Sequence, residues 1–226
     1  MKKHTDNIKV SRREVLKGLT ALGAIALLPK LLISSSEKTS SIHFIGLGGA
    51  GSSQVEFLYS KGVKGKFTCI SNPVRPNLPK EIQFVHFIPP GKSYDKNGVE
   101  KHRISDLEQP IVIPDSILNI FNSNDVFVLL SGLGGYTGTF MTEELTLLLN
   151  QRRKLFLTIS SLPFKFEGQK RRLIAENTLN KLKSMDRFQY YELENLKTKY
   201  GNLTLKDVFE KANEELYEIY RANAQV

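Results

Sequence analysis

Short apolar runs alternate with segments of helical spacing from residue 41 onward. Buried strands are predicted by the runs IHFIGL (42–47), KFTCIS (66–71), IQFVHF (82–87), DVFVLLSG (125–132), KLFLTISS (154–161) and RFQYYEL (187–193). Helices are predicted over 54–62, 114–121, 140–151, 168–185 and 205–221. Strands that alternate with helices predict an α/β fold, a Rossmann-like open and mostly parallel sheet with helices on both faces.

Polar segments separate or follow these elements. Residues 89–110 are rich in Gly, Asp and Asn, which predicts a long loop. Thr204 is the expected N-cap of the last helix. Alternating charges over 192–216 predict a solvent-exposed segment.

The N-terminal segment 1–38 has a different pattern. Arg12 and Arg13 precede an apolar stretch over 19–32, which is shorter than the roughly 20 apolar residues of a membrane span. This arrangement resembles the twin-arginine export signal of bacteria. We therefore expect export to the periplasm or cell envelope. The alternative is an uncleaved N-terminus that anchors a cytoplasmic domain, because no Ala-x-Ala site follows the apolar stretch.

Composition and charge restrict the function classes. The 226 residues are 40% apolar and 24% charged, which fits one globular domain over 39–226 behind the appendage of 1–38. The net charge is +9, of which +5 lies in residues 1–38, so the domain lacks the basic excess of a nucleic-acid binder. One Cys and four scattered His residues argue against a disulfide framework and a transition-metal site.

Two glycine-rich turns carry the candidate chemistry. GLGGAGSS (46–53) and GLGGYTGTF (132–140) each follow a predicted strand and open a helix. Backbone N–H groups at such turns bind phosphate, and two turns at one sheet edge predict a polyphosphate site. No G-x-x-x-x-G-K-[ST] motif occurs, which argues against a P-loop NTPase. Ser71, Asn72 and Pro73 stand where an NAD enzyme would carry an acidic residue.

Four segments together resemble the GTPase domain of the FtsZ and tubulin family, of the FtsZ type. They are IHFIGLGGAGSSQV, NDVFVLLSGLGGYTGT, LPFKFEGQKRR (162–172) and LTLKDVFEKANEEL (203–216). The resemblance implies the family's nucleotide-binding fold over 39–226. It also implies GTP or GDP as the ligand, with or without Mg²⁺.

The resemblance further implies which residues meet the nucleotide. The phosphates would face Gly48, Gly49, Ala50, Gly51, Ser52, Gly134, Gly135, Tyr136, Thr137, Gly138 and Thr139. Glu167 falls where the family binds the ribose, and Arg171 where a basic side chain approaches the phosphates and base. Phe209 and Asn213 would face the guanine. No catalytic residue and no protein metal ligand is assigned.

Several positions depart from the family pattern. Tyr136 and Phe140 replace glycines of the second loop, Ser52 and Ser53 replace a Gly and an Asn of the first, and Leu193 stands where an Asn lies near the base. The chain ends at residue 226, before the loop and second domain that in the family complete the neighbouring subunit's catalytic site. We therefore expect nucleotide binding with weak or no hydrolysis, and no ordinary filaments.

Two alternatives stay open. A degenerate FtsZ-like scaffold would act through protein contacts at the envelope, with an FtsZ-like or envelope protein as partner. A Tyr136 ring that fills the phosphate site would favour this scaffold. A Rossmann NADP-dependent oxidoreductase would use Arg75 for the 2′-phosphate. No alternative includes a nucleic-acid partner, and contact with a membrane is expected only through the N-terminus.

Overall fold

The computed structural model describes residues 40–72, 75, 77–87, 93–94, 100–101, 113–201 and 204–224. The predicted export signal and linker over 1–38 lie outside the described residues. Pro73, at the end of the second predicted strand, also lies outside them. The predicted domain is otherwise described over most of its length.

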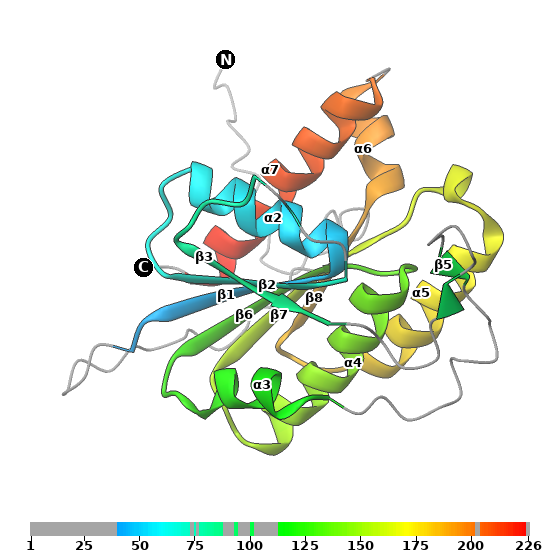
Figure 1. Ribbon diagram of the computed structural model, residues 1–226. Coiled ribbons are helices and arrows are strands. Elements are labelled where there is room, and N and C mark those ends of the chain that lie inside the picture. Colours follow the sequence, from blue (N-terminus) through cyan, green and yellow to red (C-terminus); the bar gives the residue numbers. More distant parts are fainter. Residues whose placement is uncertain are drawn as a thin grey trace, which may run out of the picture.

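Six parallel strands form one sheet in the order β3-β2-β1-β6-β7-β8 (Figure 1). Their bounds are β1 Ile42–Leu47, β2 Lys66–Ser71, β3 Ile82–His86, β6 Val126–Gly132, β7 Phe156–Leu162 and β8 Phe188–Glu192. Every predicted strand is present, and its ends agree within two residues. The strand order places β1 beside β6, so the two glycine-rich turns leave from neighbouring strands.

Helices cover both faces of the sheet (Figure 1). One face carries α2 Gly48–Ser60, α6 Leu193–Tyr200 and α7 Leu205–Ala224. The other carries α3 Asp115–Leu118 with the 3-10 turn η2 Asn119–Asn122, α4 Tyr136–Gln151 and α5 Gln169–Leu182. The 3-10 turn η3 Lys165–Glu167 leads into α5. The expected Rossmann-like α/β fold is thus confirmed.

The strands are apolar along their length because both faces of the sheet are covered. In β1, Phe44 packs in the cluster under α2 and α7, whereas Ile45 and Leu47 pack under α3 and α4. All three side chains are fully buried. Within the segment predicted as a loop, β4 Ser93–Tyr94 pairs antiparallel with β5 Glu100–Lys101.

Two helices begin earlier than predicted, because the glycine-rich turns are themselves the first turns of α2 and α4. Glycine has a low intrinsic helix propensity, so the sequence pattern did not predict helix at these turns. In the folded protein, packing overrides this propensity. A Cβ atom on Gly51 would lie 2.1 Å from the carbonyl oxygen of Leu130, so only glycine lets α2 approach β6 this closely.

The prediction that residues 192–216 are solvent-exposed holds for the charged side chains, which are exposed or half-buried, and is wrong for most of the apolar ones. This segment forms α6 and most of α7, and five of its apolar side chains are buried: Leu193, Leu196, Val208, Ala212 and Leu216. Charged residues lie between these apolar residues, so the sequence pattern did not reveal that the apolar side chains share one buried face. The predicted N-cap is confirmed, since the backbone N–H of Asp207 donates to Oγ1 of Thr204 at 3.2 Å.

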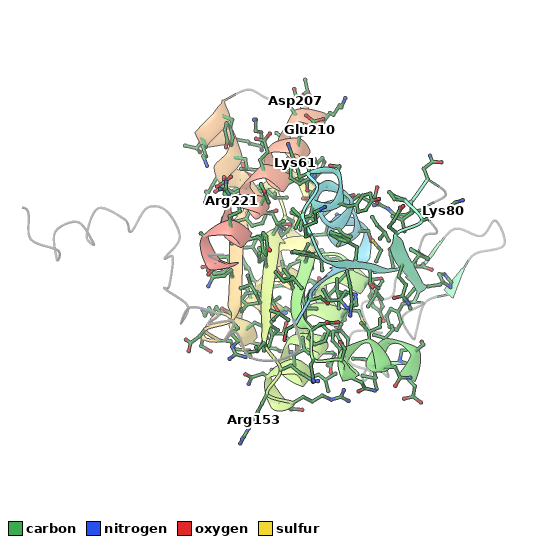
Figure 2. All side chains as sticks on the ribbon, turned by 90° about the vertical axis from the view of Figure 1, so that its left-hand side faces the viewer. Lys61, Lys80, Arg153, Asp207, Glu210 and Arg221 are labelled. Atoms are coloured by element: carbon green, nitrogen blue, oxygen red, sulfur yellow. The ribbon has the colours of Figure 1, made fainter. Side chains whose placement is uncertain are left out.

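Charged side chains lie on the outside of the molecule (Figure 2). Lys80 and Arg153 project away from the sheet in this view, as do Asp207 and Glu210 near the start of α7. Arg153 has a φ of 52° in the turn after α4. In the part of the chain that is described, no helix is long and apolar enough to cross a membrane.

Candidate functional site

A cleft of about 560 Å³ opens beyond the carboxyl ends of the central strands. Its walls come from the turns β1–α2 and β6–α4, from the segment η3–α5 and from α7. Eleven of the predicted site residues line it: Gly48, Gly49, Ala50, Gly135, Tyr136, Thr137, Gly138, Glu167, Arg171, Phe209 and Asn213. Residues far apart in the sequence are thus brought to one cavity, at the position where open α/β sheets bind ligands.

One end of the cleft is built from two helix N-termini. Neither α2 nor α4 has a side-chain hydrogen bond that caps its first turn. The first-turn N–H groups of a helix have no partner within the helix, and the helix dipole is positive at this end. This end of the cleft therefore suits an anion such as a phosphate group.

The two glycine-rich turns touch each other through their glycines. Gly48 has a φ of 72°, and a Cβ atom there would lie 2.9 Å from the backbone nitrogen of Gly138. A Cβ atom on Gly138 would lie 2.5 Å from the carbonyl oxygen of Gly132. A larger residue at position 48 would push the two turns apart, and one at position 138 would distort its own turn, so both glycines keep the anion-binding end in shape.

Four predicted site residues lie behind the wall of the cleft rather than on it. Gly51 packs α2 against β6, and Oγ of the buried Ser52 donates to the carbonyl oxygen of Gly48 at 2.9 Å. In the second turn, the N–H of Gly134 donates to Oγ1 of Thr139 at 2.8 Å. These residues hold the two turns in shape.

Glu167 and Arg171, which lie four residues apart, form an ion pair at the rim. Nη1 of Arg171 lies 2.7 Å from Oε2 of Glu167. The other carboxylate oxygen, Oε1, accepts the backbone N–H of Phe164 at 2.9 Å. Both oxygens of Glu167 are therefore engaged. Within the described residues, no other Asp or Glu lines the cleft.

Arg75 brings a second positive charge to the cleft. Its Nη2 donates to Oγ of Ser53 at 2.9 Å, and its Nη1 pairs with Glu56 on α2. Sequence reasoning considered Arg75 only as a contact for a 2′-phosphate. Arg75 follows the carboxyl end of β2, and β2 pairs with β1. This neighbourhood could have predicted that Arg75 lies beside the first glycine-rich turn.

The opposite end of the cleft is formed by α7. Phe209 is 47% exposed, and its ring meets the buried Phe164 ring edge-on, with 6.2 Å between centroids and 81° between planes. Asn213 lies one turn further along and also lines the cleft. Phe209 and Asn213 therefore share the face of α7 that lines the cleft. An aromatic face beside an amide can stack on a flat heterocycle and hydrogen-bond its edge.

Sequence reasoning missed a buried polar chain between α2, β8 and α7. Nε2 of Gln54 donates to the Tyr191 hydroxyl at 3.3 Å, and that hydroxyl donates to the Ala212 carbonyl oxygen at 3.1 Å. Burial raises the pKa of Tyr191, an effect that Ser161 and Gln54 partly offset, so the phenol stays protonated. Gln54 lies just past the glycine motif, and Tyr191 sits inside a strand pattern, so neither carried a recognisable signal.

Tyr136 lines the anion-binding end and is half-buried. Its ring packs against the ring of Phe140, one turn along α4, with 5.0 Å between centroids. Both residues replace glycines of the family pattern, so these two departures form one aromatic pair. Among the described residues, no group of three or more His, Cys, Asp or Glu side chains could hold a metal ion.

The sequence of the chain was compared with known protein families and proteins. No model of a protein family matches the chain. The chain is 28% identical over 189 residues to the cell division protein FtsZ of Aquifex aeolicus, which covers 80% of this chain and 50% of that protein. It is 25% identical over 194 residues to the mitochondrial division protein fszB of Dictyostelium discoideum, covering 82% and 52% respectively.

Solved structures match the fold. An empty FtsZ dimer of M. jannaschii has a TM-score of 0.60 at 20% identity and covers 95% of this chain and 58% of its own. A GTPγS-bound protofilament of CetZ2 from Haloferax volcanii has a TM-score of 0.56 at 16% identity, covering 81% and 59%. The sequence relatives support homology with the FtsZ/tubulin family, and the structures show its nucleotide-binding fold. The chain spans about half the length of the curated relatives it matches.

Proposed function

We propose that this chain is an FtsZ-like domain that binds GTP or GDP in the cleft described above. The observation that carries the proposal is the meeting of two uncapped helix N-termini with an aromatic and amide end in one cavity. The phosphates would face the turns around Gly48 and Gly138, and the base would lie against Phe209 and Asn213. Homology with the FtsZ/tubulin family supports the choice of a guanine nucleotide.

We further propose that hydrolysis is weak or absent. Activation of an attacking water requires a positioned base, and the single acidic residue of the described cleft wall has both oxygens engaged. Mg²⁺ typically binds through one or two carboxylates and the phosphates of its ligand. In this cleft it would depend mainly on the phosphates, so Mg²⁺ should change nucleotide affinity only modestly.

Calorimetric titration of the full chain with GTP and GDP, with and without Mg²⁺, tests the proposal. Thr137→Ala is the matched variant, because Thr137 lines the anion-binding end and its truncation needs no space. Gly138→Ala is unsuitable, since the added Cβ would collide with the Gly132 carbonyl. We expect saturable binding that Thr137→Ala weakens. An absence of binding at millimolar nucleotide contradicts the proposal.

The scaffold alternative has one observation in its favour, which is that Tyr136 lines the anion-binding end. The contact of its ring with Phe140 along α4 instead supports a ring that leaves room for phosphate. The variant Tyr136→Gly distinguishes a nucleotide-binding domain from a scaffold. A nucleotide-binding domain should bind with or without this ring. A scaffold whose site is filled by Tyr136 should bind nucleotide only after the substitution, and its partner would then be an FtsZ-like or envelope protein.

The oxidoreductase alternative would use Arg75 to bind the 2′-phosphate of NADP. The engagement of Arg75 with Glu56 and Ser53 speaks against that role. Titration with NADPH tests it, because binding of a reduced nicotinamide cofactor changes its fluorescence. We expect no change.

For location, we propose export through the twin-arginine route, supported by Arg12, Arg13 and the apolar stretch that follows them. Replacement of both arginines by lysine keeps the charge and should retain the protein in the cytoplasm. Cell fractionation measures the result. An unchanged distribution would favour the alternative of an uncleaved N-terminal anchor.

A further inference from the structure

Gln54 is a buried polar residue in the wall of the cleft, and its carboxamide oxygen accepts no hydrogen bond from the described residues. The side chain belongs to a residue that is 3% exposed, and it lines the cavity. Its Oε1 atom is buried and has no hydrogen-bond partner among the described residues. A buried carbonyl oxygen without a partner costs free energy that an apolar side chain of the same size would avoid.

The hydrogen bonds around Gln54 fix which way the carboxamide is turned. The Tyr191 hydroxyl donates its only proton to the carbonyl oxygen of Ala212, so it can only accept from Gln54. The amide nitrogen Nε2 must therefore face Tyr191. Oε1 is left as an acceptor held in place by the chain Gln54–Tyr191–Ala212.

The position of Gln54 assigns it to one end of the cleft. It lies six residues after Gly48 in α2, or about 9 Å along the helix from the anion-binding turn. Its hydrogen-bonded chain ends at Ala212, next to Asn213 on the face of α7 that lines the cleft. Leu193, which also lines this region, offers only an apolar side chain. Gln54 is therefore a polar group of the α7 end.

We propose that Gln54 is a specificity-determining residue of the cleft, whose Oε1 accepts a hydrogen bond from the N1–H or 2-amino group of a bound guanine. This inference rests on the proposed function. Guanine presents two donors on its Watson–Crick edge, N1–H and the 2-amino group, whereas adenine presents the acceptor N1 between C2–H and its 6-amino group. An acceptor fixed opposite N1–H or the 2-amino group favours guanine, because adenine has only a lone pair and a C–H at these two positions and would leave the buried oxygen unpaired.

Binding of GDP and ADP to the full chain and to Gln54→Met tests the proposal. Methionine keeps the length of the side chain and removes both polar atoms. We expect the wild-type chain to prefer GDP, and Gln54→Met to reduce the GDP-to-ADP affinity ratio by about tenfold through weaker GDP binding. Tyr191→Phe, which removes the group that orients the carboxamide, should reduce the ratio less.

Gln83→Met is the matched control, since Gln83 is exposed on β3 outside the cleft. It should leave the ratio unchanged. If Gln54→Met weakens both nucleotides equally, or leaves the ratio unchanged while the wild type binds GDP, the role of Gln54 is structural and this inference alone is overturned. If the wild-type chain binds neither GDP nor GTP, the proposed function is overturned with it.

Discussion

His43 shows how burial of one residue sets a property of the whole fold. It is 7% exposed in β1, its Nε2 lies 2.8 Å from Oγ1 of Thr68, and its Nδ1 lies 3.9 Å from Asp125. Burial lowers the pKa of His43 to about 4, although Asp125 acts in the opposite direction. The imidazole is therefore neutral in the folded protein at pH values where the unfolded chain binds a proton.

The expected consequence is a loss of stability in mild acid. Because the folded pKa of His43 lies below its unfolded value of 6.5, the free energy of unfolding should fall as the pH drops from about 6.5 to about 4, by about 2–3 kcal/mol. Asp125 adds to the loss mainly at lower pH: hydrogen bonds from Lys66, Ser41 and Ser123 overcome burial and lower its pKa from 3.8 to about 2, so its contribution to stability is lost mostly below pH 4. Urea unfolding at pH 7 and pH 4.5 measures the effect.

His43→Gln should remove most of the pH dependence in this window, because glutamine does not titrate. His86→Gln is the control, since His86 is an exposed histidine on β3. An undiminished slope in His43→Gln would show that another group causes the acid sensitivity.

Two glycines of the first turn make a second matched pair. Gly51→Ala places a Cβ atom 2.1 Å from the Leu130 carbonyl oxygen and should destabilise the fold by about 3 kcal/mol. Gly49→Ala meets nothing within 4 Å and sits in a helical turn, so it should be neutral or stabilise by up to about 1 kcal/mol. Denaturant unfolding distinguishes them, and similar values for both variants would contradict the packing argument.

At the scale of elements, α7 depends on one narrow stripe. Val208, Ala212, Leu216 and Tyr220 recur every four residues and pack in the cluster that contains Phe44 and Val128 of the sheet. The rest of the helix is largely charged. This stripe holds the wall that carries Phe209 and Asn213, so the packing of α7 also sets one side of the cleft.

Truncation within this stripe should be costly. Leu216→Ala removes a fully buried side chain and should destabilise the fold by about 2–5 kcal/mol in thermal or denaturant unfolding. Glu218→Ala, on the exposed side of the same helix, should change stability by less than about 0.5 kcal/mol. Equal effects would mean that α7 is not anchored through its stripe.

The elements also show what the sequence can predict. Buried strands such as 42–47 are continuous apolar runs, and their limits were predictable because both faces of the sheet are covered. The first turns of α2 and α4 were not predictable as helix, because their glycines are required by close contacts with atoms that lie outside these helices. The same holds for the site. Residues in the glycine motifs could be named in advance, whereas Gln54 and Tyr191 become a pair only because the Tyr191 side chain of β8 points to the face of the sheet that α2 covers.

At the scale of the whole molecule, the cleft joins elements from both faces of the sheet. Helix α2 belongs to one layer and α4 to the other, and their N-termini meet above the central strands. A ligand held between them would connect the two layers. Its binding energy should therefore appear as stability of the entire fold rather than of one loop.

GDP should accordingly raise the midpoint of thermal unfolding. At a concentration of about 100 times its Kd, a ligand stabilises a folded protein by about 2.7 kcal/mol, which corresponds to a rise of roughly 5–10 °C for a domain of this size. Thr137→Ala, at the same GDP concentration, should show a smaller rise. No rise in the wild type at millimolar GDP would count against the proposed ligand.

The pairing of β1 with β6 also sets when the cleft can form. Ser41, just before β1, donates to Asp125, just before β6, across 84 positions of the chain. The segment between them must be made and closed into a loop before these strands align, and such distant contacts form slowly. During synthesis, the first glycine-rich turn is therefore made well before its partner, and the anion-binding end can form only when the middle of the chain has emerged and folded back.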